Sequence, residues 1–211
     1  MRTRLITIVA AAALLAGCGP NNTPTSGQPT GGGQPAASST ATSPPPIAVK
    51  DITPGNCTLF AKADATKLIG GVNINNKALD IGTDGGTKTD VCSYLYLKGQ
   101  TDLQGVTYAV VRYDSAATAF AEAKKVQTEM LGSAAQNNWP VQSLTTPVPG
   151  AGPMLGGFGT KTDDGITYTI AVVGTNVGPY LVAALGASTE SADNAKRFAL
   201  TVFQALSSAV G

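Results

Sequence analysis

Two kinds of hydrophobic pattern alternate along the chain from residue 48 onward. Short runs rich in β-branched and aromatic residues, bounded by glycine and polar turns, predict strands. Apolar residues spaced three and four apart predict helices that bury one face. The expected strands are 72–81 (weak), 91–97, 106–113, 157–162, 166–173 and 180–185, and the expected helices are 61–69, 115–131 and about 191–207.

The order of these elements decides the fold class. A short helix comes first, and each of the two long helices follows a group of strands. Strands that cluster in this way, rather than alternating with helices, predict an α+β domain with a mostly antiparallel sheet. We expect about five or six strands, three helices and one disulfide in a single globular domain that covers 48–211.

The first 17 residues carry a different pattern. Arg2 and Arg4 precede an apolar run from Leu5 to Leu15. This run is too short for a comfortable transmembrane helix. A charged start, a short apolar core and small residues at its end together predict a secretory signal peptide over 1–17.

The segment ends in Leu15-Ala16-Gly17-Cys18, which is similar to the lipobox of bacterial lipoproteins. The resemblance implies cleavage before Cys18, a diacylglycerol group on the Cys18 thiol, and a new amino terminus that is acylated, as with palmitate, or left free. Two or three acyl chains anchor a protein far better than one, at about 0.8 kcal/mol per buried methylene. We therefore expect a lipid-anchored protein on the extracytoplasmic face of the cell membrane. An ordinary signal peptide with a chance cysteine is the alternative.

Residues 18–47 are expected to be the lipidated cysteine and a disordered linker. From Gly19 to Pro46 no residue is charged, and the composition is Pro, Gly, Ser, Thr, Asn, Gln and Ala. Without large apolar side chains, such a segment does not offset the entropy cost of ordering. Random-coil scaling gives a mean reach of roughly 30 Å, which would hold the domain off the membrane.

Composition and charge exclude several functions. The 211 residues include no histidine, so the chain has no Ser-His-Asp or Cys-His catalytic set and no imidazole metal ligand. Loss of Arg2 and Arg4 with the signal peptide leaves 12 of the 14 basic residues against 13 acidic ones. This nearly neutral balance gives no basic field for nucleic acid. We expect no nucleic-acid partner, no cofactor and no metal.

Cys57 and Cys92 are the cysteines that remain once Cys18 is lipidated. Because exported compartments are oxidising, we expect these two to form a disulfide, with free structural cysteines as the alternative. In the entropy model, closing a loop of about 35 residues stabilises a domain by roughly 3–4 kcal/mol. A redox site is not favoured, because Cys-x-x-Cys spacing is absent.

Three short motifs are spread over the domain: Asn56-Cys57-Thr58-Leu59-Phe60 before a short helix, Val91-Cys92-Ser93-Tyr94 in a strand, and Val148-Pro149-Gly150-Ala151-Gly152 before the final hairpin. Together they resemble a family of small lipoproteins of unknown function that is common in high-GC Gram-positive bacteria. Phe60 stands where the family pattern has leucine, and the aspartate that usually follows the second glycine of the last motif is missing. The resemblance implies the disulfide and the fold class and carries no activity.

Two tyrosines and a tryptophan are candidate binding residues. Tyr94 and Tyr96 share one face of their strand with Cys92. We interpret this face as core beside the disulfide; if the sheet is open there, the tyrosines would line a ligand pocket or a partner surface. Trp139 lies in a loop and is expected either to plug the core or to stand exposed as an anchor.

The glycine-rich stretch 150–159 is a weak binding candidate through Gly150, Gly152 and Gly157. Leu155 takes the place of the third glycine of a dinucleotide fingerprint, and Phe158 takes the place of the P-loop lysine. We therefore expect a turn or a mobile loop that would line a ligand site.

Three acidic residues give no strong metal site. Asp80, Asp84 and Asp90 lie in a polar, glycine-rich stretch. Gly82 and Val91 occupy two ligand positions of the EF-hand template, so we expect a solvated loop rather than a calcium site.

These features predict a non-catalytic binding or accessory module of the cell envelope, held by the acyl anchor on Cys18. Besides membrane lipid, the expected partner is an envelope protein, a wall polymer or a small apolar ligand. A carrier of a lipid or another hydrophobic ligand is the alternative. An envelope hydrolase that uses carboxylates is less favoured, because the sequence places no acidic pair on facing structured elements.

Overall fold

The structure is a computed structural model that describes residues 49–76, 83, 85–99, 101–136, 141–143, 155–163 and 166–211. The expected signal peptide and linker, including Cys18, lie outside these residues. Within the described part, no helix is long and apolar enough to cross a membrane.

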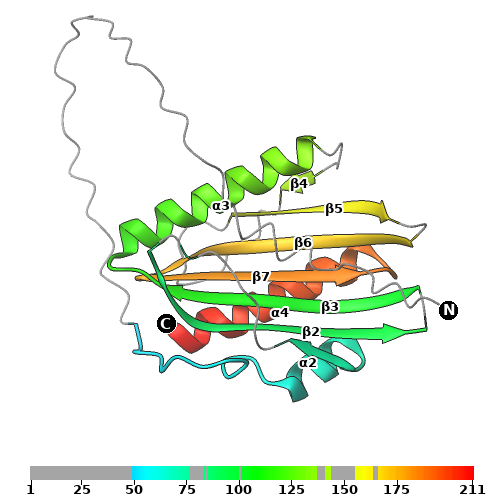
Figure 1. The fold of residues 1–211 in the computed structure, drawn as a ribbon, viewed down its shortest axis with the longest axis horizontal. Helices are drawn as coiled ribbons and strands as arrows, with labels where there is room; N and C mark the ends of the chain where they lie inside the picture. Colours follow the sequence, from blue (N-terminus) through cyan, green and yellow to red (C-terminus); the bar gives the residue numbers. More distant parts are fainter. Residues whose placement is uncertain are drawn as a thin grey trace, which may run out of the picture.

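A seven-stranded sheet forms the centre of the domain, with strand order β1-β2-β3-β7-β6-β5-β4 and every neighbouring pair antiparallel (Figure 1). Connections of two or three residues join β2 to β3, β5 to β6 and β6 to β7, and β3 pairs with β7 at the middle of the sheet. The strands are β1 (Ile74–Asn76), β2 (Thr87–Lys98), β3 (Asp102–Arg112), β4 (Val141–Ser143), β5 (Leu155–Asp163), β6 (Ile166–Val177) and β7 (Tyr180–Ser188).

The described part also holds three helices, α2 (Lys62–Ile69), α3 (Ala116–Gln136) and α4 (Ala192–Val210). The α+β class, the antiparallel sheet, the three helices and the disulfide are therefore confirmed. The sheet exceeds the expected five or six strands because β4 was not predicted. This edge strand has only three residues, too few to show an alternating pattern.

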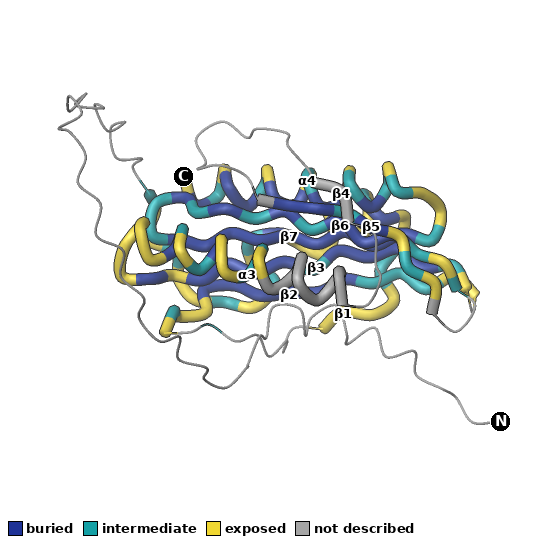
Figure 2. The backbone as a smooth tube through the Cα atoms, turned by 90° about the horizontal axis from the view of Figure 1, so that it is seen from above, coloured by how far each residue is buried: buried dark blue, intermediate teal, exposed yellow. Residues whose placement is uncertain are grey.

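The helices cover both faces of the sheet. Helices α2 and α4 pack on one face. Helix α3 packs on the other, across β6 and β7, and Figure 2 shows α3 and α4 on the two sides of the strands. The larger core lies under α4, where Phe198, Val202, Phe203 and Leu206 are fully buried. Their spacing of three and four produces the single buried stripe that the sequence predicted for this helix.

Local contacts fix where helix α4 begins and how closely it packs on the sheet. The side chain of Ser191 caps the helix by accepting a hydrogen bond from the backbone N–H of Asn194 at 3.1 Å. Gly186 of β7 lies beneath the first turns of the helix, where a side chain would overlap the backbone at Ala195 and Ala199. The absence of a side chain at Gly186 therefore sets how closely α4 approaches the sheet.

An N-terminal strap, residues 49–60, leads from the end of α4 to the start of α2 (Figure 1). At its first end, the backbone N–H of Lys50 donates to Val210 O at 3.0 Å. The Tyr180 hydroxyl donates to Lys50 O at 3.1 Å and accepts from the Ile52 N–H at 3.2 Å. Midway along the strap, the Gly55 N–H donates to Thr89 O at 2.7 Å. The strap is thus bound to the rest of the domain at its start and at its middle.

Candidate functional site

The disulfide joins Cys57 of the strap to Cys92 of β2, with Cα atoms 4.9 Å apart. This confirms the predicted pairing. Cys57 has a left-handed backbone with φ of 62°, the one positive φ outside glycine among the described residues. Such a conformation costs a non-glycine residue about 1–3 kcal/mol and persists only where the surroundings impose it. The bridge and the hydrogen bonds on either side of it impose it here.

Of the two candidate tyrosines, Tyr94 belongs to the core. Its side chain is fully buried, and its hydroxyl donates to Phe60 O at 2.9 Å. The interpretation of this face as core beside the disulfide is therefore confirmed for Tyr94, and its alternative place on a ligand or partner surface is wrong. Tyr96 is half-buried at the margin of the same core.

The glycine candidates do not form a common site within the described residues. Gly157 is a buried residue of β5, paired with Ser143 of β4 and Val172 of β6. The expected strand 157–162 is confirmed within β5, and the expectation of a turn or mobile loop over 150–159 is wrong at Gly157, because β5 is hydrogen-bonded on both sides there. Trp139, Gly150 and Gly152 lie outside the described residues.

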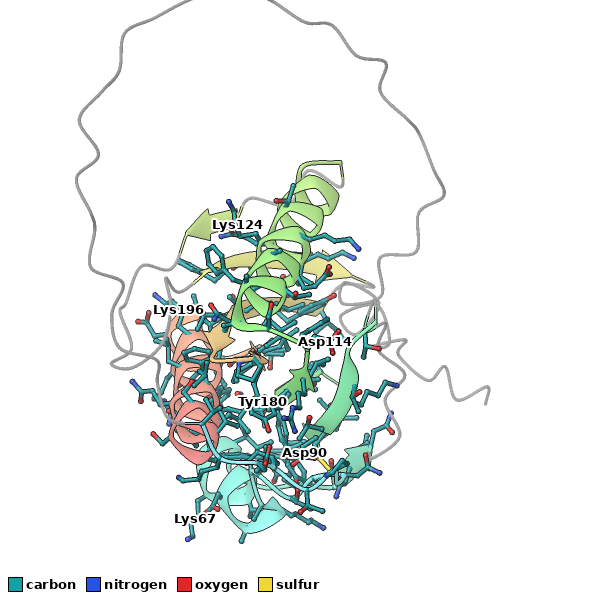
Figure 3. The ribbon with its side chains drawn as sticks, turned by 90° about the vertical axis from the view of Figure 1, so that its left-hand side faces the viewer. Lys67, Asp90, Asp114, Lys124, Tyr180 and Lys196 are labelled. Carbon is teal, nitrogen blue, oxygen red and sulfur yellow. A yellow bond between two sulfur atoms is a disulfide. The ribbon has the colours of Figure 1, made fainter. Side chains whose placement is uncertain are left out.

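The structure adds a buried acid that the sequence interpretation placed in a loop. Asp90 is a fully buried residue of β2 and lies near the disulfide in Figure 3. A bulge between Lys88 and Asp90 shifts the strand register there. From Asp90 onward the pairing with β3 is regular, so alternation places the carboxylate on the face that carries Cys92 and Tyr94.

One carboxylate oxygen of Asp90 accepts four hydrogen bonds. Its Oδ2 accepts from the backbone N–H of Thr58 at 2.8 Å and from that of Leu59 at 2.6 Å. It also accepts from the Thr58 hydroxyl at 2.9 Å and the Tyr108 hydroxyl at 3.1 Å. The other oxygen, Oδ1, has no partner in the described part of the chain. We call Asp90, Tyr94, Tyr108 and the backbone of 58–60 the acid cluster.

The phenols of the acid cluster stay protonated at neutral pH. Burial raises the pKa of Tyr108, and the negative charge of Asp90 raises it further. Burial also raises the pKa of Tyr94, with smaller contributions from Asp90 and Asp64. Both hydroxyls therefore act as donors, Tyr108 toward the carboxylate and Tyr94 toward Phe60 O. The Phe60 N–H in turn donates to the Tyr108 oxygen at 3.3 Å.

This arrangement binds the strap rather than a substrate. Every donor that faces Asp90 Oδ2 belongs to the protein itself, and three of the four come from Thr58 and Leu59. Within the described residues, no group of three or more cysteine or acidic side chains is placed to hold a metal ion. The chemistry of the acid cluster is therefore charge-assisted hydrogen bonding that fixes the strap on β2.

A second polar set crosses the same face at the opposite end of the sheet. Five residues on five neighbouring strands lie opposite one another in register. By the alternation of side chains along each strand, all five are on the same face of the sheet as the core residues under α4. The members of this polar row are Tyr96, Gln104, Ser188, Thr169 and Thr160. Of these five, the sequence analysis singled out only Tyr96. A signal for Gln104 was present, because alternation places it on the same face as Val106 and Tyr108 in a strongly apolar strand.

Most of the polar row is satisfied internally. The Ser188 hydroxyl oxygen accepts from the N–H groups of Glu190 and Ser191 at 3.1 and 3.3 Å. The hydroxyls of Thr160 and Thr169 share a hydrogen bond of 2.8 Å. Gln104 differs, because its side chain is buried and neither its Nε2 nor its Oε1 has a partner in the described part.

A comparison of the sequence with protein-family models finds no matching family, and a comparison with curated proteins finds no similar sequence. The resemblance to the small lipoprotein family therefore stays a prediction.

Proposed function

We propose that this protein is a lipoprotein anchored through Cys18 to the extracytoplasmic face of the cell membrane. Its domain would act as a non-catalytic binding or accessory module of the cell envelope. The observation that carries the proposal is that three features follow one another along the chain: the motif Leu15-Ala16-Gly17-Cys18, an uncharged segment over 19–46, and a domain with a disulfide. They would serve as an anchor, a spacer and an exported domain.

The strap supports the proposal, because it gives the tether a firm attachment. A pull on residue 49 would first load the bonds of Lys50 and Ile52 to Val210 and Tyr180. Further along, the load would reach the disulfide, which ties the strap covalently to β2. A tethered domain needs such an attachment, since force on its terminus would otherwise peel the chain from the core.

The position of the strap also decides where the tether joins the domain. The strap begins beside Val210, at the end of the sheet that carries Arg112 and Tyr180 (Figure 1). The polar row lies at the opposite end of the strands, away from this attachment point. The expected partner of such a module is an envelope protein, a wall polymer or a small apolar ligand.

The anchor is tested by Cys18→Ser in the full chain. We expect the variant to leave the membrane fraction, with the membrane-bound amount falling by about tenfold or more, because serine would not receive the acyl chains that provide the anchoring energy. The measurement is immunoblotting of carbonate-washed membranes and of the soluble fraction.

The matched control is the double variant Cys57→Ala/Cys92→Ala, which removes the other two cysteines. It should stay with the membrane, because it keeps Cys18. Retention of the Cys18→Ser variant in carbonate-washed membranes would contradict the proposed anchor.

A further inference from the structure

The strap (Figure 1) is held by two groups of contacts that differ in kind. Its first part, residues 49–56, is held by hydrogen bonds between neutral groups, one exposed ion pair and half-buried side chains. Its second part, residues 57–60, is held by the disulfide and the acid cluster. We call these two parts the outer strap and the inner strap. They meet at Cys57, where the covalent attachment begins.

Tyr180 is the main attachment point of the outer strap. Its hydroxyl donates to Lys50 O at 3.1 Å and accepts from the Ile52 N–H at 3.2 Å. Farther along, the Gly55 N–H donates to Thr89 O at 2.7 Å. All of these groups are neutral, and a single hydrogen bond between neutral groups adds only modestly to stability.

The rest of the outer strap lies close to solvent. None of its eight residues is buried, and five of them are exposed. Val49 and Ile52 pack against the core under α4, but each is only half-buried. The ion pair of Asp51 with Arg112 is 2.9 Å long, yet the two side chains are 88% and 52% exposed, so water screens it. Such accessible contacts are typical of segments that open locally while the rest of a domain stays folded.

The inner strap is attached much more firmly. The disulfide ties Cys57 to a fully buried cysteine of β2. Directly after it, Asp90 accepts hydrogen bonds from the backbone of Thr58 and Leu59, and bonds to a carboxylate are roughly twice as strong as neutral ones. Phe60 is buried, and both its N–H and its O bond to tyrosine hydroxyls in the core. Detachment that begins at the start of the strap would therefore end at Cys57.

Detachment of the outer strap would lengthen the tether appreciably. A fully extended chain spans about 3.3–3.6 Å per residue, so residues 49–56 would add up to about 27 Å. The expected linker over 18–47 has a mean reach of roughly 30 Å. Opening the outer strap would thus nearly double this reach, while the sheet, α4 and the disulfide keep their structure.

We propose that the outer strap is a reversible extension of the tether. Residues 49–56 leave the domain and return to it as one unit, and the disulfide and the acid cluster hold the chain from Cys57 onward. The extension lets the folded domain reach a partner farther from the membrane and brings it back when the contacts form again. The inference rests on the proposed function, which supplies the tether, and names how the reach of the module is regulated.

The test is hydrogen exchange of the ¹⁵N-labelled full chain in detergent, followed residue by residue by NMR, for the wild type and Tyr180→Phe. Phenylalanine keeps the fully buried ring and removes only the hydroxyl. We expect the amides of Lys50, Ile52 and Gly55 to exchange about tenfold faster in the variant. The Gly55 N–H bonds to β2 and not to Tyr180, so its acceleration would show that the outer strap opens as one unit.

The amide of Leu59 reads the inner strap in the same experiment. Relative to the core amide of Val182, its exchange should stay unchanged in Tyr180→Phe. Tyr113→Phe is the matched control, because it removes a tyrosine hydroxyl that donates to Thr83 O at 2.8 Å, outside the strap. It should leave exchange in the outer strap unchanged.

Two results of Tyr180→Phe would overturn the proposal. No acceleration in the outer strap, or acceleration of Ile52 without Gly55, would show that residues 49–56 do not open as one unit. Equal acceleration of Gly55 and Leu59 would show that the chain is not held at Cys57. Membrane fractionation of Cys18→Ser reads the anchor separately, so failure of the extension is distinguishable from failure of the proposed function.

Discussion

Gly186→Ala is expected to destabilise the domain by about 3 kcal/mol or more, although it adds only one methyl group. Gly186 lies on β7 under α4. The added Cβ would overlap Ala195 O, and it would lie 2.7 Å from Ala199 N and 2.8 Å from the Phe198 Cβ. Two of these three atoms belong to the helix backbone, which yields only if the whole helix shifts. Such a shift would loosen the core beneath α4, where the largest buried side chains lie.

The measurement is the free energy of unfolding in urea, with the disulfide intact. Gly105→Ala is the matched control, because it adds the same methyl group to the neighbouring strand β3. There the closest atom is the Leu95 Cδ2 at 2.6 Å, the end of a flexible, half-buried side chain rather than backbone. We expect the control to cost about 1 kcal/mol or less. Equal effects of the two substitutions would show that α4 does not lie against Gly186 as described.

Asp90→Ala is expected to lower the free energy of unfolding by about 3 kcal/mol or more, because it leaves several donors without an acceptor. The Leu59 N–H and the Tyr108 hydroxyl would lose their charged partner in or near the core. Thr58 would recover part of its loss, since it is exposed and water reaches it. Asp90→Asn keeps the shape of the side chain, and the loss of charge alone should cost about 1–2 kcal/mol.

Hydrogen exchange separates this effect from general destabilisation. In Asp90→Ala, the amides of Thr58 and Leu59 should lose protection first, because the strap is released before the sheet. Asp193→Ala is the control for removing an acid. Its carboxyl is exposed and pairs with Lys196, and hydrogen bonding to that lysine lowers the pKa of Asp193. That variant should unfold almost as the wild type does. Unchanged exchange at Thr58 and Leu59 in Asp90→Ala would contradict the role of the acid cluster.

Local pattern was enough to predict most elements of this fold. The central strands β3 and β7 bury both faces, while β2 is buried over its middle and β6 mainly on one face. The valine-rich and tyrosine-rich runs of these strands are visible in the sequence. The buried stripe of α4 follows directly from spacing. The pairing of Cys57 with Cys92 needed only the assumption of an oxidising compartment.

The candidate site was harder to predict, because it depends on contacts between distant segments. Alternation places Asp90 on the face of Cys92 and Tyr94. The strand begins with polar residues and contains a bulge between Lys88 and Asp90, so its first part resembles a loop in the sequence. Gln104 becomes notable only once Ser188 and Tyr96 are known to flank it, and no local pattern gives that register. Likewise, alternation placed Tyr94 and Tyr96 on one face but did not show that α2 and the strap bury the first of them.

The central claim is that the mature protein begins at a lipidated Cys18. The most direct test is mass spectrometry of the N-terminal peptide of the protein extracted from membranes of cells that produce the full chain. We expect a peptide that begins at Cys18 and carries at least the mass of a diacylglycerol group. A peptide that retains residues 1–17, or one with an unmodified Cys18 thiol, would contradict the account.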